Sequence, residues 1–289
     1  MTLPTRRLGR TGHESSVAVL GAAAFSRSNP EETESAFNAA LAGGVNHLDI
    51  APRYGAAEEL VGPLLPAVRD RLFVGCKTTR RNADGVRAQL ENSLSLLGCE
   101  QFDLYQMHAV TDMAELDARA DAAAAILQAR DEGLCRFVGV TGHDLGAPKA
   151  HAEAVRRYDL DTVMFPVNPR LWADPDYRRD AESLLALCAE RDVGVMAIKA
   201  AAARPWTANE SRHATTWYEP YTDEESVARG VRFALSVPGV HAFCTPGDVK
   251  VLSTALDAAA GFTPMTEDDR RSASDEVSNE PLIFPMPQG

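Results

Sequence analysis

The sequence predicts a closed (β/α)₈ barrel preceded by a β-hairpin. Short apolar runs, typical of buried strands, alternate with amphipathic helical segments along the chain, and this alternation favours a parallel sheet covered by helices. Eight such units fit within 289 residues, which favours a closed barrel over an open sheet. Because no change in composition marks a boundary, we expect a single domain over residues 1–289.

The local signals are clearest at helix starts. Asn29 followed by Pro30 predicts a capped start, because proline is favoured at the first helical position. Thr222 to Glu225 predict a second start through a capping box. In chain order we expect a hairpin at 5–16; strands at 17–21, 45–50, 72–76, 102–107, 136–140, 161–165, 193–198 and 240–244; and helices from Pro30 to Gly43, at 56–68, through Val86 to Leu97, at 114–132, 147–157, 178–190, 222–235 and 247–260, and from Thr266.

Charge and composition argue against several classes of partner. The net charge of -12 disfavours nucleic acid or an anionic membrane as the main partner. No apolar run is long enough to span a bilayer, and residues 1–10 lack the apolar core of a secretory leader. The five cysteines are odd in number and scattered. They predict reduced thiols in a cytoplasmic protein, with neither a disulfide framework nor a zinc site.

Ionisable residues follow three successive strands. Asp49 lies in an apolar strand, with Tyr54 in the loop after it, and Lys77 and His108 end the next two strands. The carboxyl ends of parallel strands meet at one end of a barrel, with neighbours about 4.8 Å apart, so these groups can converge. Each also has a simpler interpretation. Within 46–55 alone, an Asp that caps a helix beside a packed Tyr explains the pattern equally well.

Taken together, the four groups fit an acid catalyst. A buried Asp49 requires a cationic partner, which Lys77 would supply. The ammonium of Lys77 is then expected to lower the pKa of Tyr54 from about 10 to about 7, a change of roughly 4 kcal/mol. The phenol would donate a proton near neutral pH, while His108 would orient or polarise a carbonyl oxygen.

A sequence that carries these four residues in this order resembles the aldo-keto reductase superfamily, and this chain resembles a divergent bacterial-type member of it. The shared motifs are Arg7-Leu-Gly-Arg-Thr-Gly12, Val45-Asn-His-Leu-Asp-Ile-Ala-Pro-Arg-Tyr-Gly55, Phe73-Val-Gly-Cys-Lys77, Asp103-Leu-Tyr-Gln-Met-His108, Gly133-Leu-Cys-Arg-Phe-Val-Gly-Val140 and Pro246-Gly247. The resemblance implies reduction of an aldehyde or ketone, or the reverse reaction, with NADPH as the expected cofactor and NADH as the alternative. It places Asp49, Tyr54, Lys77 and His108 on the catalytic tetrad, with Tyr54 as general acid.

The cofactor half of the chain departs from the family pattern. The resemblance assigns cofactor contacts to Gly21, Ala22, Thr141, Gly142, Lys199, Gly247, Asp248 and Lys250. The departures are Thr141-Gly142 in place of Ser-Asn, Met164 in place of Gln, and Ile198-Lys199 in place of an aromatic residue that stacks on nicotinamide. Backbone amides at the helix start after the last strand are expected to hold phosphate, with Asp248 opposing it and Lys250 compensating.

The segment 200–221 is expected to shape the substrate pocket. The expected pocket walls are Phe25, Trp206, Trp217 and Tyr218. An equally good interpretation is that the aromatics of this segment only anchor it to the barrel. Cations that would meet an anionic group are Lys199, Arg204 and Arg212. The C-terminal run 281–287 either folds over the barrel mouth or is loose.

Two other classes of function stay open. A barrel that keeps the tetrad without productive dinucleotide use would be a binding or regulatory protein, or would catalyse a dehydration or isomerisation; the departures at Thr141-Gly142, Met164 and Asp248 motivate this alternative. A metal-dependent hydrolase or lyase is disfavoured, because no HxH or paired His/Asp spacing occurs at strand ends, and no metal is expected. The expected partner is a small carbonyl compound, with no nucleic acid or membrane; self-association stays open.

Overall fold

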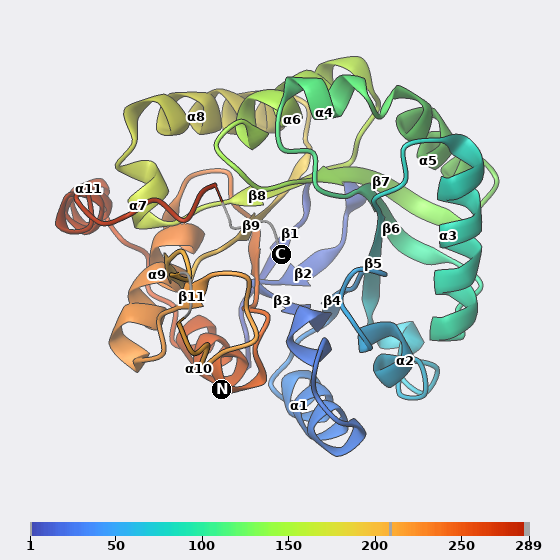
Figure 1. Cartoon of the computed structure of the whole chain (residues 1–289), viewed down its shortest axis with the longest axis horizontal. Helices are drawn as coiled ribbons and strands as arrows, with labels where there is room; N and C mark the ends of the chain where they lie inside the picture. The colour runs from blue at the N-terminus through green and yellow to red at the C-terminus, as the bar shows by residue number, and fades with distance from the viewer. Residues whose placement is uncertain (1, 208–209, 286–289) are drawn as a thin grey trace.

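The centre of the molecule is a barrel of parallel strands (Figure 1). The computed structural model describes residues 2–207 and 210–285. Within that part, eight strands close in the order β12-β3-β4-β5-β6-β7-β8-β9, with β12 paired to β3. The predicted (β/α)₈ fold class is confirmed. The barrel strands are β3 (Ala18–Gly21), β4 (His47–Asp49), β5 (Phe73–Thr78), β6 (Phe102–Met107), β7 (Cys135–Thr141), β8 (Thr162–Pro166), β9 (Gly194–Ile198) and β12 (Ala242–Cys244).

The predicted hairpin, β1 (Thr5–Arg7) with β2 (Glu14–Ser16), is present and closes the amino end of the barrel. Between its strands, Leu8 is fully buried against side chains of six barrel strands: Val19, Phe73, Leu104, Met164, Met196 and Ala242. Gly9 has a φ of +48°, and an added Cβ would lie 2.3 Å from the backbone nitrogen of Gly194. This close approach requires glycine. A functional site is therefore left to the opposite end, where the strands have their carboxyl termini.

The helices form the outer layer of the molecule (Figure 1). Apolar stripes, such as Val86, Leu90 and Leu94 of α3, pack into the main hydrophobic core. In the part of the chain that the structure describes, no helix is long and apolar enough to cross a membrane. The helices are α1 (Pro30–Ala42), α2 (Ala57–Val61), α3 (Ala83–Leu97), α4 (Met113–Asp117), α5 (Ala120–Asp131), α6 (Ala147–Arg157), α7 (Pro169–Trp172), α8 (Pro175–Glu190), α9 (Glu224–Ser236), α10 (Val249–Ala260) and α11 (Glu267–Glu276).

Two predicted helices are interrupted. The helix expected at 56–68 ends before Pro63, because proline lacks the backbone N–H that the next turn needs. The helix expected at 114–132 is split into α4 and α5 at Arg119, whose buried guanidinium turns back to hydrogen-bond Glu115. Both differences concern the outer layer and leave the strand ends unchanged.

Side-chain caps decide where α1 and α9 begin. The Asn29 side chain accepts a hydrogen bond from the Glu32 backbone N–H, and the Glu32 carboxylate accepts one from the Asn29 N–H. This capping box starts α1 at the predicted residue. Helix α9 is capped by Asp223, which accepts from the Ser226 N–H. The box predicted from Thr222 is wrong by one residue, because aspartate is the stronger cap.

Two segments lie at the carboxyl ends of the strands. The segment after β9 forms a small ladder of β10 (Ala202–Arg204) with β11 (Glu219–Pro220). The C-terminal tail runs back towards the centre of the view in Figure 1, and the Phe284 ring stacks on His143, which follows β7, with ring centroids 6.3 Å apart. The predicted run 281–287 thus covers part of this end as far as residue 285, and its last two residues lie outside the described part.

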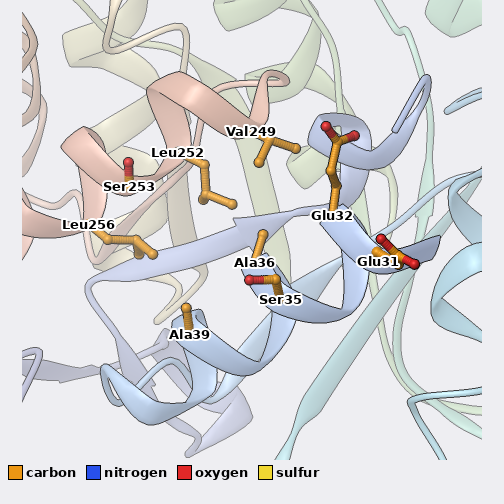
Figure 2. A pocket seen from close by; sticks show the side chains of 9 residues that line it. All are labelled: Glu31, Glu32, Ser35, Ala36, Ala39, Val249, Leu252, Ser253 and Leu256. Atoms are coloured by element: carbon orange, nitrogen blue, oxygen red, sulfur yellow. The ribbon is translucent and has the colours of Figure 1, made fainter. Parts of the chain in front are cut away.

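A groove outside the barrel runs between α1 and α10 (Figure 2). It has a volume of about 450 Å³ and is lined by Glu31, Glu32, Ser35, Ala36, Ala39, Val249, Leu252, Ser253 and Leu256. The volume would suit a small ligand. However, its walls are mainly apolar, and Glu31 and Glu32 are its ionisable lining residues. None of the groups predicted for catalysis lies in this groove.

We expect Asn29→Ala to lower the free energy of unfolding by about 1 kcal/mol, because α1 loses its cap. Chemical denaturation of the full chain measures this change. Asn38→Ala is the matched control, since Asn38 is exposed within α1 and alanine is the better helix former. Equal losses of stability in the two variants would contradict the capping role.

Candidate active site

Asp49 and Lys77 form a buried ion pair at the carboxyl end of the barrel. Asp49 ends β4, and its neighbours Leu48 and Ile50 belong to the main core. Because side chains alternate along a strand, Asp49 points to the other face, into the barrel. The Lys77 ammonium donates hydrogen bonds to both Asp49 carboxylate oxygens, each at 2.5 Å. The side chains are 1% and 2% exposed, so each charge depends on the other.

Tyr54 and His108 lie beside this pair. The loop after β4 turns at Gly55, where φ is +54° and an added Cβ would lie 2.2 Å from the Ser26 carbonyl oxygen. Tyr54 lies in this loop, and its hydroxyl oxygen is 3.0 Å from the Lys77 ammonium nitrogen. His108 directly follows β6, and its ring meets the Tyr54 ring edge-on at 5.8 Å between centroids. The structure therefore brings the four predicted residues together.

The pKa of Tyr54 differs from the expectation. Burial raises this pKa well above its ordinary value of 10.0; the Lys77 ammonium opposes the rise, and the Asp49 carboxylate adds to it. The expected lowering to about 7 is wrong for this arrangement. Asp49 cancels much of the field that Lys77 exerts on the phenol, so burial prevails. Tyr54 is consequently a protonated phenol at neutral pH.

The protonation of the other three groups follows from the same surroundings. Burial acts to lower the pKa of Lys77, but the Asp49 carboxylate, together with Tyr54 and Cys244, raises this pKa above 10.5. Burial raises the pKa of Asp49, against the attraction of Lys77. Burial, followed by the charge of Lys77, lowers the pKa of His108 well below 6.5, so its imidazole is neutral. Its buried Nδ1 has no hydrogen-bond partner among the described residues.

The residues predicted to contact a cofactor lie near the carboxyl ends of four strands. Gly21 ends β3, with Ala22 next to it; Thr141 ends β7, with Gly142 next to it; Lys199 follows β9; and Gly247, Asp248 and Lys250 surround the start of α10. Packing within the chain explains two of the glycines. A Cβ at Gly21 would lie 2.8 Å from the Cys244 sulfur, and one at Gly142 would lie 1.9 Å from the Val110 carbonyl oxygen.

The start of α10 is occupied by the chain's own carboxylate. One oxygen of Asp248 accepts a hydrogen bond from the Lys250 N–H at 2.9 Å. The other accepts from the backbone N–H of Thr215 at 2.8 Å and from its hydroxyl at 3.1 Å. The segment after β9 is thereby tied to this helix start. A phosphate placed here would meet a negative charge and would compete with Thr215 for space.

Three of the four predicted pocket walls are buried and present no open surface at the barrel mouth. Phe25 is 0% and Trp206 3% exposed, so both belong to the packing. The Trp206 indole N–H donates to a backbone carbonyl within its own segment, as buried indoles commonly do, and so anchors it. Tyr218 is also buried. Trp217 is 45% exposed, and its ring lies 6.0 Å from that of Tyr54. Trp217 alone of the four presents a wall.

Two of the cations considered for an anionic group are engaged within the segment after β9. Arg204 forms ion pairs with Glu210 at 2.8 Å and with Glu219. The Arg212 guanidinium lies over the Trp206 ring, 5.7 Å from its centroid. These two arginines therefore stabilise the segment itself.

One residue near the site, Cys244, is not predicted by the sequence. Cys244 ends β12 and places its sulfur 3.7 Å from an Asp49 carboxylate oxygen. Phe284, whose ring covers His143, belongs to the run 281–287, for which folding over the mouth is one of the two interpretations of the sequence. A single cysteine has no spacing that predicts a site. Only barrel closure, which puts β12 two strands from β4, brings Cys244 near Asp49.

These features define a class of α/β-barrel proteins with an acid–base site at the carboxyl ends of the strands. A sequence profile described as the aldo/keto reductase family matches residues 18–219. The chain belongs to the aldo/keto reductase family, as the resemblance indicated. The matched range includes the four predicted tetrad residues and ends before α10.

Individual relatives are more distant. An aldo-keto reductase of Mycobacterium sp. (strain KMS) is 33% identical over 119 residues, which cover 40% of this chain and 42% of that protein. An uncharacterized oxidoreductase of Bacillus subtilis is 25% identical over 206 residues, 66% of this chain and 63% of that protein. The matches thus span about half the length of these curated relatives. The holo form of an aldo-keto reductase from Bacillus halodurans shares the fold, with a TM-score of 0.71, 19% identity and coverage of 98% and 99% of the two chains.

We expect Lys77→Met to lower the free energy of unfolding by about 3–5 kcal/mol, because Asp49 would remain as a buried, unpaired carboxylate. The double variant Asp49→Asn/Lys77→Met should lose less than the two single variants combined, since it leaves no uncompensated ion. Urea unfolding of the four proteins, wild type included, measures the coupling. Strictly additive losses would show that the two side chains do not stabilise one another.

Proposed function

We propose that this chain reduces an aldehyde or ketone to an alcohol, or catalyses the reverse, with hydride from a reduced nicotinamide dinucleotide and a proton from Tyr54. The observation that supports this most directly is the hydrogen-bonded series Asp49, Lys77, Tyr54 at the carboxyl end of the barrel. Membership of the aldo/keto reductase family supports the same reaction class. Relatives in Mycobacterium and Bacillus bear the name aldo-keto reductase.

The polar groups at the mouth are compatible with a dinucleotide. The buried Nδ1 of His108, unpartnered among the described residues, is an atom that a bound ligand would satisfy. We propose NADPH as the cofactor, with NADH as the alternative, and contacts from Gly21, Ala22, Thr141, Gly142, Gly247, Asp248 and Lys250. The positive charge of Lys250 would compensate the negative charges of the phosphate and of Asp248. When bound, the dinucleotide supplies the hydride.

The chain's own residues handle the proton. As a carbonyl carbon gains hydride, its oxygen becomes negative, and the Tyr54 hydroxyl donates its proton to that oxygen. The phenolate left on Tyr54 faces the Lys77 ammonium at 3.0 Å. Asp49 keeps that ammonium ionised and in position. The neutral imidazole of His108 donates a hydrogen bond that orients the carbonyl.

Lys77 acts mainly on the state that follows proton transfer. Before transfer, Tyr54 is neutral, and burial keeps its pKa raised. After transfer, the partly buried phenolate is adjacent to the Lys77 cation, which stabilises it more than it stabilises the phenol. An interaction that strengthens as charge develops lowers the barrier. Positioned proton transfer of this kind contributes roughly 10²–10⁴-fold to rate.

Tyr54→Phe should lower kcat for aldehyde reduction by about 100-fold or more, because the proton donor is lost. Steady-state assays with NADPH measure the rate, and circular dichroism checks the fold. Tyr158→Phe is the matched control, since Tyr158 lies before β8, at the opposite end of the barrel. Full activity in the Tyr54 variant would rule out this role.

A second candidate function is favoured by the Asp248 carboxylate at the start of α10. It sits where phosphate would be held, and Thr215 is hydrogen-bonded to it. In this alternative the chain does not use a dinucleotide productively. Tyr54 and Lys77 would then serve a dehydration or isomerisation, or the chain would be a binding or regulatory protein.

Titration with NADPH and, separately, NADH distinguishes the two candidates. Partly exposed Trp217 beside Tyr54 should report binding through fluorescence quenching. The reductase proposal predicts saturable binding at about micromolar concentration and turnover of an aldehyde. Lys250→Met should weaken NADPH binding more than NADH binding, and Lys149→Met, at an exposed position of α6, should change neither. A folded sample that binds neither dinucleotide would favour the second candidate.

We also propose that residues 1–289 form one domain that acts in the cytoplasm on a small carbonyl compound. The net charge of -12 supports partners other than nucleic acid or an anionic membrane surface.

A further inference from the structure

Lys199 is held rigidly at the carboxyl end of β9. Its backbone φ is +66°, a left-handed conformation that side-chain-bearing residues adopt rarely. Its carbonyl oxygen accepts hydrogen bonds from the Asn168 side-chain amide and the Ala202 N–H, both at 3.1 Å. The unusual conformation is thus fixed by neighbours on both sides, and it sets the direction in which the side chain leaves the strand.

Aromatic faces, and not acids, surround the ammonium of Lys199. Its nitrogen lies 4.5 Å from the Tyr218 ring centroid and 5.7 Å from that of Trp217. Among the described residues, no carboxylate is within ion-pair distance of it. The other shielded lysine, Lys77, has Asp49 as its counter-ion. Lys199 is only partly exposed to water and has no counter-ion in the described part of the chain. Such a cation is unfavourable, so an incoming anion would be bound strongly.

The groups that face Lys199 leave its charge uncancelled at neutral pH. Burial lowers the pKa of His143, after β7, to about 4, so this ring is uncharged. Burial raises the pKa of the Tyr218 phenol and of the Cys244 thiol, so both keep their protons. Beyond Cys244, the Asp49 carboxylate is already paired with Lys77.

Lys199 and the proton donor Tyr54 share Trp217 as a neighbour. The Trp217 ring is 6.0 Å from the Tyr54 ring and 5.7 Å from the Lys199 nitrogen, so it lies beside both. A molecule whose carbonyl reaches Tyr54 and whose body lies along this exposed indole would bring its other groups beside Lys199. The anion and the carbonyl would then be separated by several bonds.

We propose that Lys199 binds the carboxylate of the substrate, so that the site prefers aldehydes carrying a carboxylate several bonds from the carbonyl. This inference rests on the proposed carbonyl reduction. It assigns Lys199 to the substrate, whereas the family resemblance assigned it to the cofactor.

The pH dependence follows from the protonation of Lys199. Burial lowers its pKa to about 8, so the ammonium is charged below that pH and neutral above it. For a carboxylate-bearing aldehyde, kcat/KM should therefore fall as the pH rises from about 7 to about 9. For a neutral analogue, kcat/KM should stay constant over the same pH range, because Tyr54 remains protonated and His108 remains neutral there.

The test compares para-carboxybenzaldehyde with para-carbamoylbenzaldehyde, which have nearly the same size and differ in charge. The quantity measured is the ratio of their kcat/KM values. Lys199→Met should lower this ratio about tenfold, roughly the effect of one hydrogen bond to a charged group. Lys199→Arg should restore most of it. The exposed Lys149→Met is the matched control and should keep the wild-type ratio.

The outcomes decide whether Lys199 binds the substrate carboxylate. If Lys199→Met still reduces both aldehydes at the wild-type ratio, this inference is overturned and the proposed function stands. If the ratio is unchanged but the affinity for NADPH falls, Lys199 belongs to the cofactor site and the inference is again overturned. If the folded wild type reduces neither aldehyde, both proposals fall. Should Lys199→Met not fold, the wild-type pH profiles of the two aldehydes decide, and parallel profiles would overturn the inference.

Discussion

The buried ion pair between Asp49 and Lys77 is the interaction on which the carboxyl end of the barrel depends. In the β4–β5 register, Asp49 lies opposite Gly75, and Lys77 follows two residues later on the same face. A slip of one residue would turn Lys77 away from Asp49 and leave two charges without partners. The pair therefore requires this register, and it supplies the cation beside Tyr54.

Mutual neutralisation of the pair explains why Tyr54 is a protonated phenol and not an unusually strong acid. The net field that Asp49 and Lys77 exert on the phenol is small, so burial dominates its pKa. Under the proposed function, the pair matters most after the proton leaves, when a phenolate faces the Lys77 ammonium. Stability and catalysis then depend on the same two hydrogen bonds, which is why the effects of Lys77→Met on folding and on rate have to be measured separately.

The rest of the site is assembled by segments that are far apart in the sequence. Trp217 comes from the segment after β9, Cys244 from the last barrel strand, and Phe284 from the C-terminal tail. Barrels commonly carry chemistry on strand ends and specificity on the loops that follow them. Here the loop contribution is an exposed indole beside both Tyr54 and Lys199. This arrangement makes the segment after β9 the region where substrate preference would change most readily.

The amino-acid sequence was sufficient to predict the barrel, its hairpin and the position of Asp49, Lys77 and His108 at consecutive strand ends. These properties follow from local patterns: apolar alternation, helix-capping residues, and polar residues placed where strands end. Three further properties could be seen only in the folded chain: which aromatic side chains are buried, the hydrogen bond between Thr215 and Asp248, and the raised pKa of Tyr54. Burial and charge compensation depend on atoms brought together from distant parts of the chain, and no local pattern records those distances.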